Sequence, residues 1–253
     1  MTDQPALKFN SDLYTPEVMG TILDQFREKG WARLPQLFER ESVDAFVEQV
    51  HRARFHNGLE WTLPDDQPIF VWAAQAPRIR QVIVPAMSYS VAPPVPSLFL
   101  SVWIIQPVDT PQVVPKWHKD RQPEGMPGNQ YHYPDDVFVA MYFEDMTEEC
   151  GPALIVPGSH RDGAITPWSG EPHEAMLGRK EDGILLDQRA WHCGMPRTLP
   201  GTRLTALYGY FPVPLFYGAP LRMPRAQRDA WMKAGSREDQ GFWGGIFRPP
   251  DRP

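Results

Sequence analysis

The chain of 253 residues is 42% hydrophobic and 22% charged, which is typical of a single globular domain and excludes a disordered or fibrous protein. Its formal net charge is -6 and its Lys and Arg residues form no runs, so we expect no nucleic-acid partner. The N-terminal segment lacks the apolar core of a signal peptide, and the longest nearly apolar stretch, SLFLSVWII, is too short to cross a bilayer. Together with only two cysteines, these features lead us to expect a cytoplasmic protein without a membrane partner.

Helical patterns lie in the N-terminal part, about residues 1–90, where two helices are expected. The first has Thr15 as its N-cap and Pro16 at the first helical position, and it ends at Gly30. Its apolar residues recur every four positions, at Val18, Ile22 and Phe26. A second helix follows the extended segment WARLP and has the spacing of one buried stripe, at Val43, Phe46, Val47 and Val50. We expect both helices to pack against a sheet.

A strand-rich core is expected over about residues 91–212, where short segments rich in β-branched and aromatic residues are separated by Pro, Gly and Asp. These segments are SLFLSVWIIQ, VFVAMYF, ALIVP, GILLD and RLTALYGYF. Because most connections hold no helix of useful length, antiparallel pairing is favoured over a parallel α/β sheet. We therefore expect one domain over residues 1–253, mainly β with flanking helices, whose core is a cupin-like jelly roll, or double-stranded β-helix. The tail, residues 213–253, has no assigned role.

Two long connections interrupt this pattern, at residues 121–136 and 161–182. Long connections in a compact domain are often binding loops or lids, so we expect substrate selection to depend on them. Within the first connection, Tyr131 and His132 are candidates for substrate contact. His160 ends the PGSH turn that precedes the second connection, and we expect it to stabilise that turn rather than to bind metal.

A metal-binding pattern begins with His118 and Asp120, which lie where a strand is expected to end. Residues two apart in a strand point to the same face, so this imidazole and this carboxylate converge while Lys119 points away. A second histidine from a distant strand would complete a two-histidine, one-carboxylate facial triad, which leaves coordination positions open. We select His192, which we expect at the end of the apolar strand that begins with GILLD, followed by turn residues.

An arginine and a hydroxyl group follow in the next expected strand. Arg203 stands eleven residues after His192, and Thr205, two residues further on, faces the same way as Arg203. A guanidinium group matches a carboxylate in a bidentate pair. These two side chains can therefore hold a carboxylate that lies remote from the metal.

The segments WHKD, CGPALIVPGSHRDG and GILLDQRAWHCGMPRTLPGTR resemble, in order and spacing, the phytanoyl-CoA dioxygenase (PhyH) superfamily of iron(II)/2-oxoglutarate oxygenases. The resemblance runs from about Leu23 to about Phe211. That family usually has Gly-Asp before the strand of the last ligand, whereas this chain has Asp182 followed by Gly183. We interpret this difference as a shifted turn.

The resemblance implies an iron(II) cofactor whose ligands are His118, Asp120 and His192. It also implies that Arg203 binds the distal carboxylate of 2-oxoglutarate, with Thr205 and Gln106 as additional residues of the co-substrate site. The implied activity is that of a dioxygenase that uses 2-oxoglutarate and dioxygen, hydroxylates a small organic substrate, and releases succinate and carbon dioxide.

The sequence leaves three alternatives to a 2-oxoglutarate-dependent hydroxylase. Related halogenases lack the metal carboxylate, so the presence of Asp120 favours hydroxylation or a related oxidation. A cupin-like metalloenzyme that does not use 2-oxoglutarate is a second possibility, and Arg203 with Thr205 argues against it. A non-catalytic jelly-roll binding module is a third, and the complete set of ligands argues against that. The sequence specifies neither the substrate nor the oligomeric state.

Overall fold

The computed structural model describes residues 6–52, 59–60, 73, 76–87, 96–105, 115–121, 132–134 and 136–212. Its helices are α1 (Pro16–Lys29), α2 (Arg40–Arg52), α4 (Pro77–Ala86) and the short 3-10 helix η1 (Glu148–Cys150). None of the helices within these ranges is long and apolar enough to span a bilayer. Gln106, Tyr131 and the tail 213–253 lie outside the described residues.

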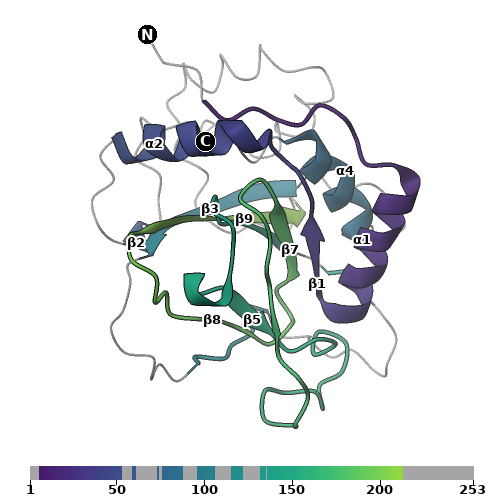
Figure 1. Ribbon diagram of the computed structural model, residues 1–253. Coiled ribbons are helices and arrows are strands. Elements are labelled where there is room, and N and C mark those ends of the chain that lie inside the picture. The colour runs from purple at the N-terminus through teal and green to yellow at the C-terminus, as the bar shows by residue number, and fades with distance from the viewer. Residues whose placement is uncertain are drawn as a thin grey trace, which may run out of the picture.

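The strands form two antiparallel sheets (Figure 1). The larger sheet has the order β1 (Trp31–Leu34), β7 (Gly183–Asp187), β4 (Val137–Met141), β9 (Arg203–Pro212), β3 (Pro96–Ile105) and β2 (Leu59–Glu60). The smaller sheet has the order β6 (Glu174–Ala175), β5 (Ala153–Ile155) and β8 (His192–Gly194). All of the pairs between these strands are antiparallel, which confirms the pairing predicted from the sequence.

Helix α1 begins and ends as its sequence predicts. The hydroxyl of Thr15 accepts a hydrogen bond from the N–H of Val18, which otherwise has no partner within the helix. Gly30 adopts the left-handed conformation with φ 84°, and its N–H donates to the carbonyl of Phe26. Both ends of the helix are therefore specified locally.

Helix α2 is also confirmed, and its apolar stripe is buried at Val43, Phe46 and Val50. Helix α4 is not one of the two helices predicted from the sequence, although it lies in the part expected to be helical. Its ten residues include Pro77 at the start and Pro85 inside, and prolines obscure a helical pattern in a sequence.

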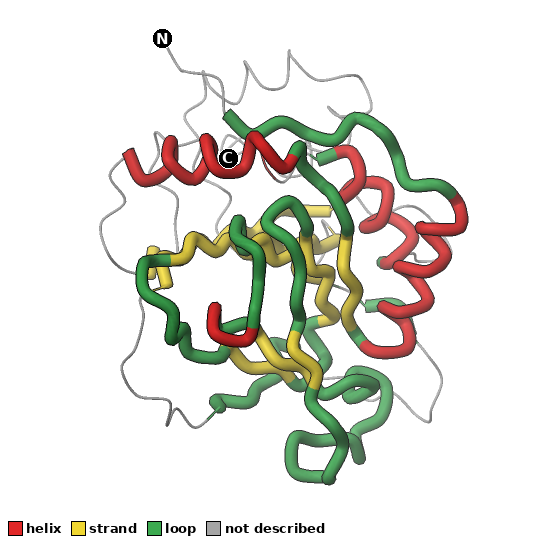
Figure 2. Tube along the Cα trace, in the orientation of Figure 1, coloured by secondary structure: helices red, strands yellow, loops and turns green. Residues whose placement is uncertain are grey.

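The larger sheet separates two buried hydrophobic clusters. Residues on its outer face pack with helices α1, α2 and α4, and they include Val139, Leu185, Leu204 and Tyr208. Residues on its inner face pack with the smaller sheet, and they include Ala140 and Leu186. Figure 2 shows that mainly loops surround the smaller sheet. Because side chains alternate along a strand, Arg203 and Thr205 of β9 lie on the inner face.

The turn before β7 contains Asp182 followed by Gly183, the reverse of the Gly-Asp order that is usual in the family the sequence resembles. The buried carboxylate of Asp182 accepts hydrogen bonds from the N–H of Gln36 at 2.7 Å and from the N–H of Arg179 at 2.9 Å. The acidic side chain thereby fixes this turn against the end of β1. The shifted turn thus has a structural role.

Gly183 begins β7 at a point where neighbouring elements approach closely. A Cβ atom at this position would lie 2.6 Å from Cδ1 of Leu37 and 3.1 Å from Cγ1 of Val139. We therefore expect Gly183→Ala to lower the free energy of unfolding by about 1–3 kcal/mol, the usual range for overpacking. Denaturant unfolding checks this against Gly194→Ala in β8, whose added methyl group would meet no atom of the described residues within 4 Å. Equal losses in the two variants would contradict the prediction.

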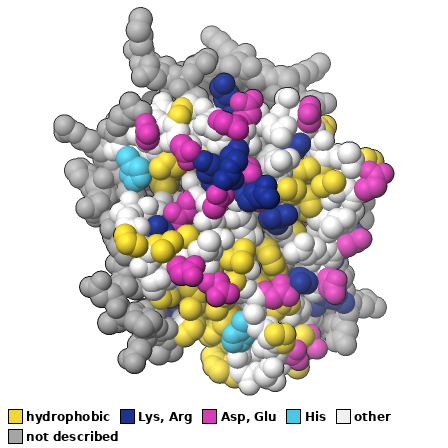
Figure 3. All heavy atoms as spheres, viewed as in Figure 1, with side chains coloured by type: hydrophobic (Ala, Val, Ile, Leu, Met, Phe, Trp, Pro, Cys, Tyr) yellow, Lys and Arg dark blue, Asp and Glu magenta, His cyan; other side chains and the backbone are white. Residues whose placement is uncertain are grey.

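Basic and acidic side chains are interspersed on the face seen in Figure 3. Arg40, at the start of α2, pairs with Asp145 and donates to Glu181 at 2.6 Å. Lys180 pairs with Asp44 of α2 at 2.6 Å. Exposed ion pairs contribute little stability one by one. Together, these pairs connect α2 to the loops that follow β4 and precede β7.

Candidate metal centre

Backbone hydrogen bonds hold together two segments that are distant in the sequence. His118 and His192 form an antiparallel bridge, in which the N–H of each donates to the carbonyl of the other at 3.0 Å. The N–H of Asp120 donates to the carbonyl of Gln188 at 3.1 Å. The backbone therefore fixes the register between the first two predicted ligands and the third.

The strand context of both histidines differs from the prediction. His192 does not end the strand GILLD, because β7 stops at Asp187 and His192 begins β8 in the smaller sheet. His118 lies in an isolated bridge rather than at the end of a long strand. The turn at residues 188–191 carries the chain from one sheet to the other, and the apolar pattern does not reveal that crossing.

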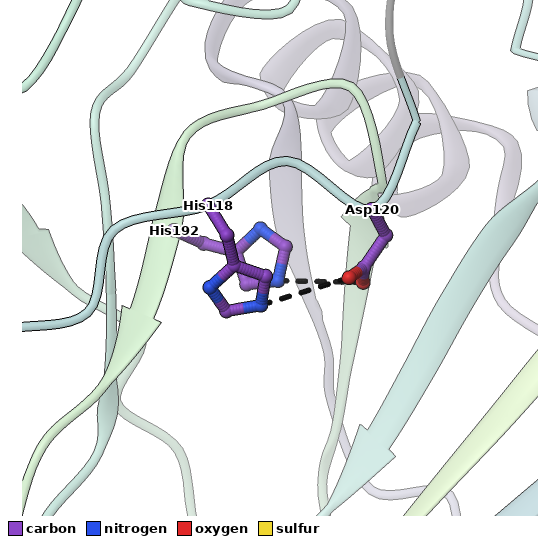
Figure 4. A group of neighbouring side chains, drawn as sticks. All are labelled: His118, Asp120 and His192. Atoms are coloured by element: carbon purple, nitrogen blue, oxygen red, sulfur yellow. Dashed lines mark ion pairs between the residues drawn. The ribbon is translucent and has the colours of Figure 1, made fainter.

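The side chains of His118, Asp120 and His192, hereafter the metal triad, point toward one another (Figure 4). Nε2 of His118 lies 3.6 Å from Oδ1 of Asp120, and Nε2 of His192 lies 3.5 Å from Oδ2. One ligand atom from each residue lies within 4.8 Å of the others. Among the described residues, no other group of three His, Cys, Asp or Glu side chains meets this condition.

The tautomers of both histidines follow from their backbone contacts. Nδ1 of His118 lies 2.9 Å from the carbonyl of Lys116, and Nδ1 of His192 lies 3.0 Å from the carbonyl of Ala190. A carbonyl only accepts hydrogen bonds, so Nδ1 carries the proton in each neutral ring. Each Nε2 then presents its lone pair, which is the arrangement that metal-binding imidazoles adopt.

Exposure and charge suit the metal triad to a cation that also takes ligands from solution. The exposed fractions of the side chains are 50% for His118, 32% for Asp120 and 10% for His192, whereas structural zinc sites are closed. Partial burial raises the pKa of Asp120, but the charge of Arg121, together with the two histidines in their protonated form, outweighs this effect and lowers the pKa below its usual value. Asp120 is therefore ionised at neutral pH.

Arg203, at the start of β9, is buried and held by several acceptors. Its Nε donates to the hydroxyl of Thr205 at 2.9 Å, as the shared strand face predicts. Its Nη1 donates to the carbonyls of Cys150 at 2.5 Å and Gly151 at 2.9 Å. Nη2 makes no hydrogen bond to any residue that the structure describes. Burial lowers the pKa of Arg203, but a guanidinium group remains charged at neutral pH.

Tyr142, which directly follows β4, was not among the predicted site residues. Its ring centroid lies 5.0 Å from Cζ of Arg203, and its hydroxyl accepts a hydrogen bond from the N–H of Ala153 at 3.3 Å. Strand β5, which Ala153 begins, also pairs Ile155 with His192. Tyr142 therefore links the arginine to the strand that supports a triad histidine. Alternation along VFVAMYF is the signal that would have placed it on the inner face.

His160 stabilises the PGSH turn and does not belong to the metal triad, as predicted. Its Nε2 donates a hydrogen bond to the carbonyl of Arg27, near the C-terminal end of α1, at 3.0 Å. Burial lowers the pKa of His160 to about 4, so its imidazole is neutral at pH 7.

This neutral imidazole predicts a pH dependence of stability. In the unfolded chain the pKa of a histidine is about 6.5, whereas His160 in the folded protein takes up a proton only near pH 4. Between these values the unfolded state binds more protons, so the free energy of unfolding falls as the pH is lowered. We expect His160→Asn to be less stable at pH 7 but to show a weaker fall across this window in denaturant unfolding. Parallel curves for the two proteins would contradict this.

The first long connection is fixed at both ends near the metal triad. Arg121 forms an ion pair with Asp136, which joins the two ends of the connection. Nη2 of Arg189 donates to the carbonyl of His132 at 2.9 Å, and the same arginine pairs with the buried Asp187. The connection therefore begins and ends beside the metal triad. The predicted contact of its side chains with substrate stays a prediction.

The second long connection, residues 161–182, packs against residues that flank the histidines. The rings of Trp168 and Trp191 meet edge to face with centroids 5.5 Å apart, and the rings of His173 and Trp117 lie 4.5 Å apart. Trp117 and Trp191 each directly precede a triad histidine, and neighbouring side chains of extended segments point to opposite faces. This part of the connection therefore lies on the face away from the metal triad. Its predicted role in substrate selection remains untested.

The fold and the site define a jelly-roll protein with a facial set of metal ligands. The family profile for phytanoyl-CoA dioxygenase (PhyH) matches residues 11–196, a match that includes the whole metal triad and ends before Arg203. The chain belongs to the phytanoyl-CoA dioxygenase (PhyH) family. A comparison with curated proteins finds no match.

Several solved structures share the fold at low sequence identity. The non-haem alpha-ketoglutarate-dependent epimerase SnoN from nogalamycin biosynthesis has a TM-score of 0.59 and 18% identity, over 79% of this chain and 85% of that chain. HygX from Streptomyces hygroscopicus, with nickel and 2-oxoglutarate bound, has a TM-score of 0.58 and 19% identity, over 79% and 88%. The carbocyclase SnoK from nogalamycin biosynthesis has a TM-score of 0.52 and 20% identity, over 88% and 91%. These likenesses confirm the predicted fold class.

Proposed function

We propose that the protein is an iron(II)- and 2-oxoglutarate-dependent oxygenase that oxidises a small organic molecule. The observation that carries the proposal is the convergence of two Nε2 atoms and one carboxylate on a partly exposed point of a PhyH-family jelly roll. The similarity to HygX, which has been crystallised with iron and, separately, with nickel and 2-oxoglutarate, supports the same choice of cofactor and co-substrate.

The donors of the metal triad fit iron(II). Two neutral imidazoles and one carboxylate carry a single negative charge. This charge attracts a divalent cation, and the bound cation keeps a net positive charge. A facial set of two histidines and one carboxylate with open positions is typical of non-haem iron(II) oxygenases. The backbone contacts of both Nδ1 atoms support this fit, because they orient each Nε2 before any metal binds.

Arg203 is the proposed anchor for the distal carboxylate of 2-oxoglutarate. Two of its nitrogens are occupied by this chain, which orients the guanidinium group, and Nη2 is left to donate. The hydroxyl of Thr205 accepts from Arg203 and keeps its own proton as a second donor. We also retain Gln106 in the proposed co-substrate site, on the family resemblance alone.

The chain's own contribution to the reaction is orientation and charge. Bound iron(II) would supply dioxygen activation, which couples decarboxylation of 2-oxoglutarate to succinate and carbon dioxide with oxidation of the substrate. Asp120 and the two histidines hold the cation, and Arg203 fixes the far end of the co-substrate, so the reacting groups meet in one geometry. The buried inner face around Arg203 limits the access of water. Hydroxylation is the outcome we propose.

Succinate formation tests this proposal without knowledge of the substrate. Purified protein is incubated aerobically with iron(II) and 2-oxoglutarate, and succinate is measured by mass spectrometry. We expect slow succinate formation that requires both iron and oxygen and is absent in His192→Ala. Protein that binds metal at the triad but neither binds nor consumes 2-oxoglutarate would contradict the proposal and favour a cupin-like metalloenzyme.

A further inference from the structure

Ser159, in the PGSH turn, contacts both ligand-bearing segments at once. Its side chain is buried, with 1% of the residue exposed. Its hydroxyl accepts a hydrogen bond from the N–H of Trp191 at 2.8 Å, and its carbonyl accepts one from Nζ of Lys119 at 2.7 Å. Trp191 directly precedes His192, and Lys119 stands between the other two members of the metal triad.

The side chain of Lys119 points away from the metal triad, because neighbouring side chains of an extended segment point to opposite faces. Nζ of Lys119 lies 5.6 Å from the ring centroid of Trp191, so the two flanking side chains also meet each other. The N–H of Val156 donates to the carbonyl of Trp191 at 2.9 Å, which fixes the start of the turn to the same residue. The turn therefore contacts both segments, while the bridge between the histidines joins them directly.

The turn is itself fixed to the C-terminal end of α1. Nε2 of His160 donates to the carbonyl of Arg27 at 3.0 Å, and the N–H of Gly158 donates to the carbonyl of Lys29 at 3.2 Å. Gly30 lets the turn approach, because a Cβ atom there would lie 2.7 Å from Nδ1 of His160. The last carbonyls of a helix have no partner within it, so the turn also satisfies the end of α1.

We infer that Ser159 is a positioning residue for the metal triad, which it joins to α1 through the PGSH turn. The inference rests on the proposed metal-binding function. Without the hydroxyl, the N–H of Trp191 loses its acceptor, and the segment that carries His192 loses one of its two bonds to the turn and its neighbour Val156. Without the ammonium group of Lys119, the segment that carries the other two ligands loses its tie to the turn. Either change should separate the ligand atoms and weaken metal binding.

Binding of cobalt(II) by the full-length, metal-free protein tests the inference, since cobalt gives a visible spectrum that reports ligand geometry. The variants are Ser159→Ala and Lys119→Met. Methionine keeps an apolar chain similar to that of lysine but lacks the ammonium group. Ser42→Ala is the matched control, because Ser42 is also buried and its hydroxyl accepts from the N–H of Lys8 at 3.0 Å and donates to the carbonyl of Glu39 at 2.7 Å. Thermal unfolding of each metal-free protein accompanies the titration.

We expect Ser159→Ala and Ser42→Ala to lower the unfolding midpoint alike, but only Ser159→Ala to weaken cobalt affinity, by about ten- to hundredfold, and to alter the bound spectrum. Lys119→Met should also weaken the affinity for cobalt. If Ser159→Ala does not fold, Lys119→Met alone tests the inference. Wild-type affinity and spectrum in these variants would overturn the inference while leaving the proposed function intact. Absence of cobalt binding in the wild type would overturn the proposed function, and the inference with it.

Discussion

Replacing Asp120 with alanine is expected to weaken iron binding by more than about a hundredfold and to abolish the proposed oxygenase activity. Its carboxylate is the single negative charge of the metal triad, and it lies 3.5–3.6 Å from both imidazole nitrogens. Loss of groups that merely orient metal ligands weakens metal sites by about ten- to hundredfold, so loss of a ligand should exceed that range. Anaerobic calorimetric titration with iron(II) measures the effect.

Asp162→Ala is the control for this variant. Asp162 lies in the second long connection, where its carboxylate accepts a hydrogen bond from the N–H of Ala164 at 2.8 Å, and it belongs to no group of metal ligands in the described residues. Its replacement should leave iron affinity unchanged. Iron affinity at the wild-type level in Asp120→Ala, with the fold intact, would show that the carboxylate is not a ligand.

Replacing Arg203 with methionine is expected to raise the KM for 2-oxoglutarate by about a hundredfold while leaving iron affinity unchanged. A hydrogen bond between charged groups contributes about 1.5–3 kcal/mol, and the proposed contact involves a guanidinium group and a carboxylate. The iron ligands lie on other segments, so the metal should still bind. The KM for 2-oxoglutarate, measured by succinate formation, and iron affinity, measured by titration, separate the two effects.

Arg197→Met provides a matched control on a second buried arginine. All three nitrogens of Arg197 are occupied by this chain: Nη1 by Glu144, Nε by the carbonyl of Gly201, and Nη2 by the carbonyl of Pro200. Because each of its nitrogens already donates to this chain, its loss should lower stability without a specific effect on the KM for 2-oxoglutarate. Equal increases in this KM for the two variants would point to general disruption and against an anchoring role for Arg203.

The features that could be predicted from the sequence are those with local signals. Thr15 and Gly30 define α1 because capping involves only neighbouring residues. His118 and Asp120 could be placed on one face because their spacing alone determines it in an extended segment. The pairing of Arg203 with Thr205 followed from the same alternation along a strand.

The features that escaped prediction depend on contacts between distant segments. The chain crosses between sheets just before His192, and only the backbone bonds of the smaller sheet distinguish this from a continued strand. Tyr142 acquires its role from the guanidinium group of Arg203, which lies on another strand. Ser159 contacts Trp191 and Lys119 across 32 and 40 residues of sequence. The PGSH motif could therefore be recognised from the sequence, but the positioning role proposed for its serine could not.

The most direct test of the central claim is an anaerobic titration of the metal-free protein with iron(II) and then with 2-oxoglutarate, followed by visible absorption. Chelation of iron by 2-oxoglutarate produces a metal-to-ligand charge-transfer band. The proposed function predicts a band that requires iron, saturates with 2-oxoglutarate, and is lost or much weakened in Arg203→Met at the same concentrations. A correctly folded, iron-loaded wild-type protein that develops no band would contradict the claim that this metal centre uses 2-oxoglutarate.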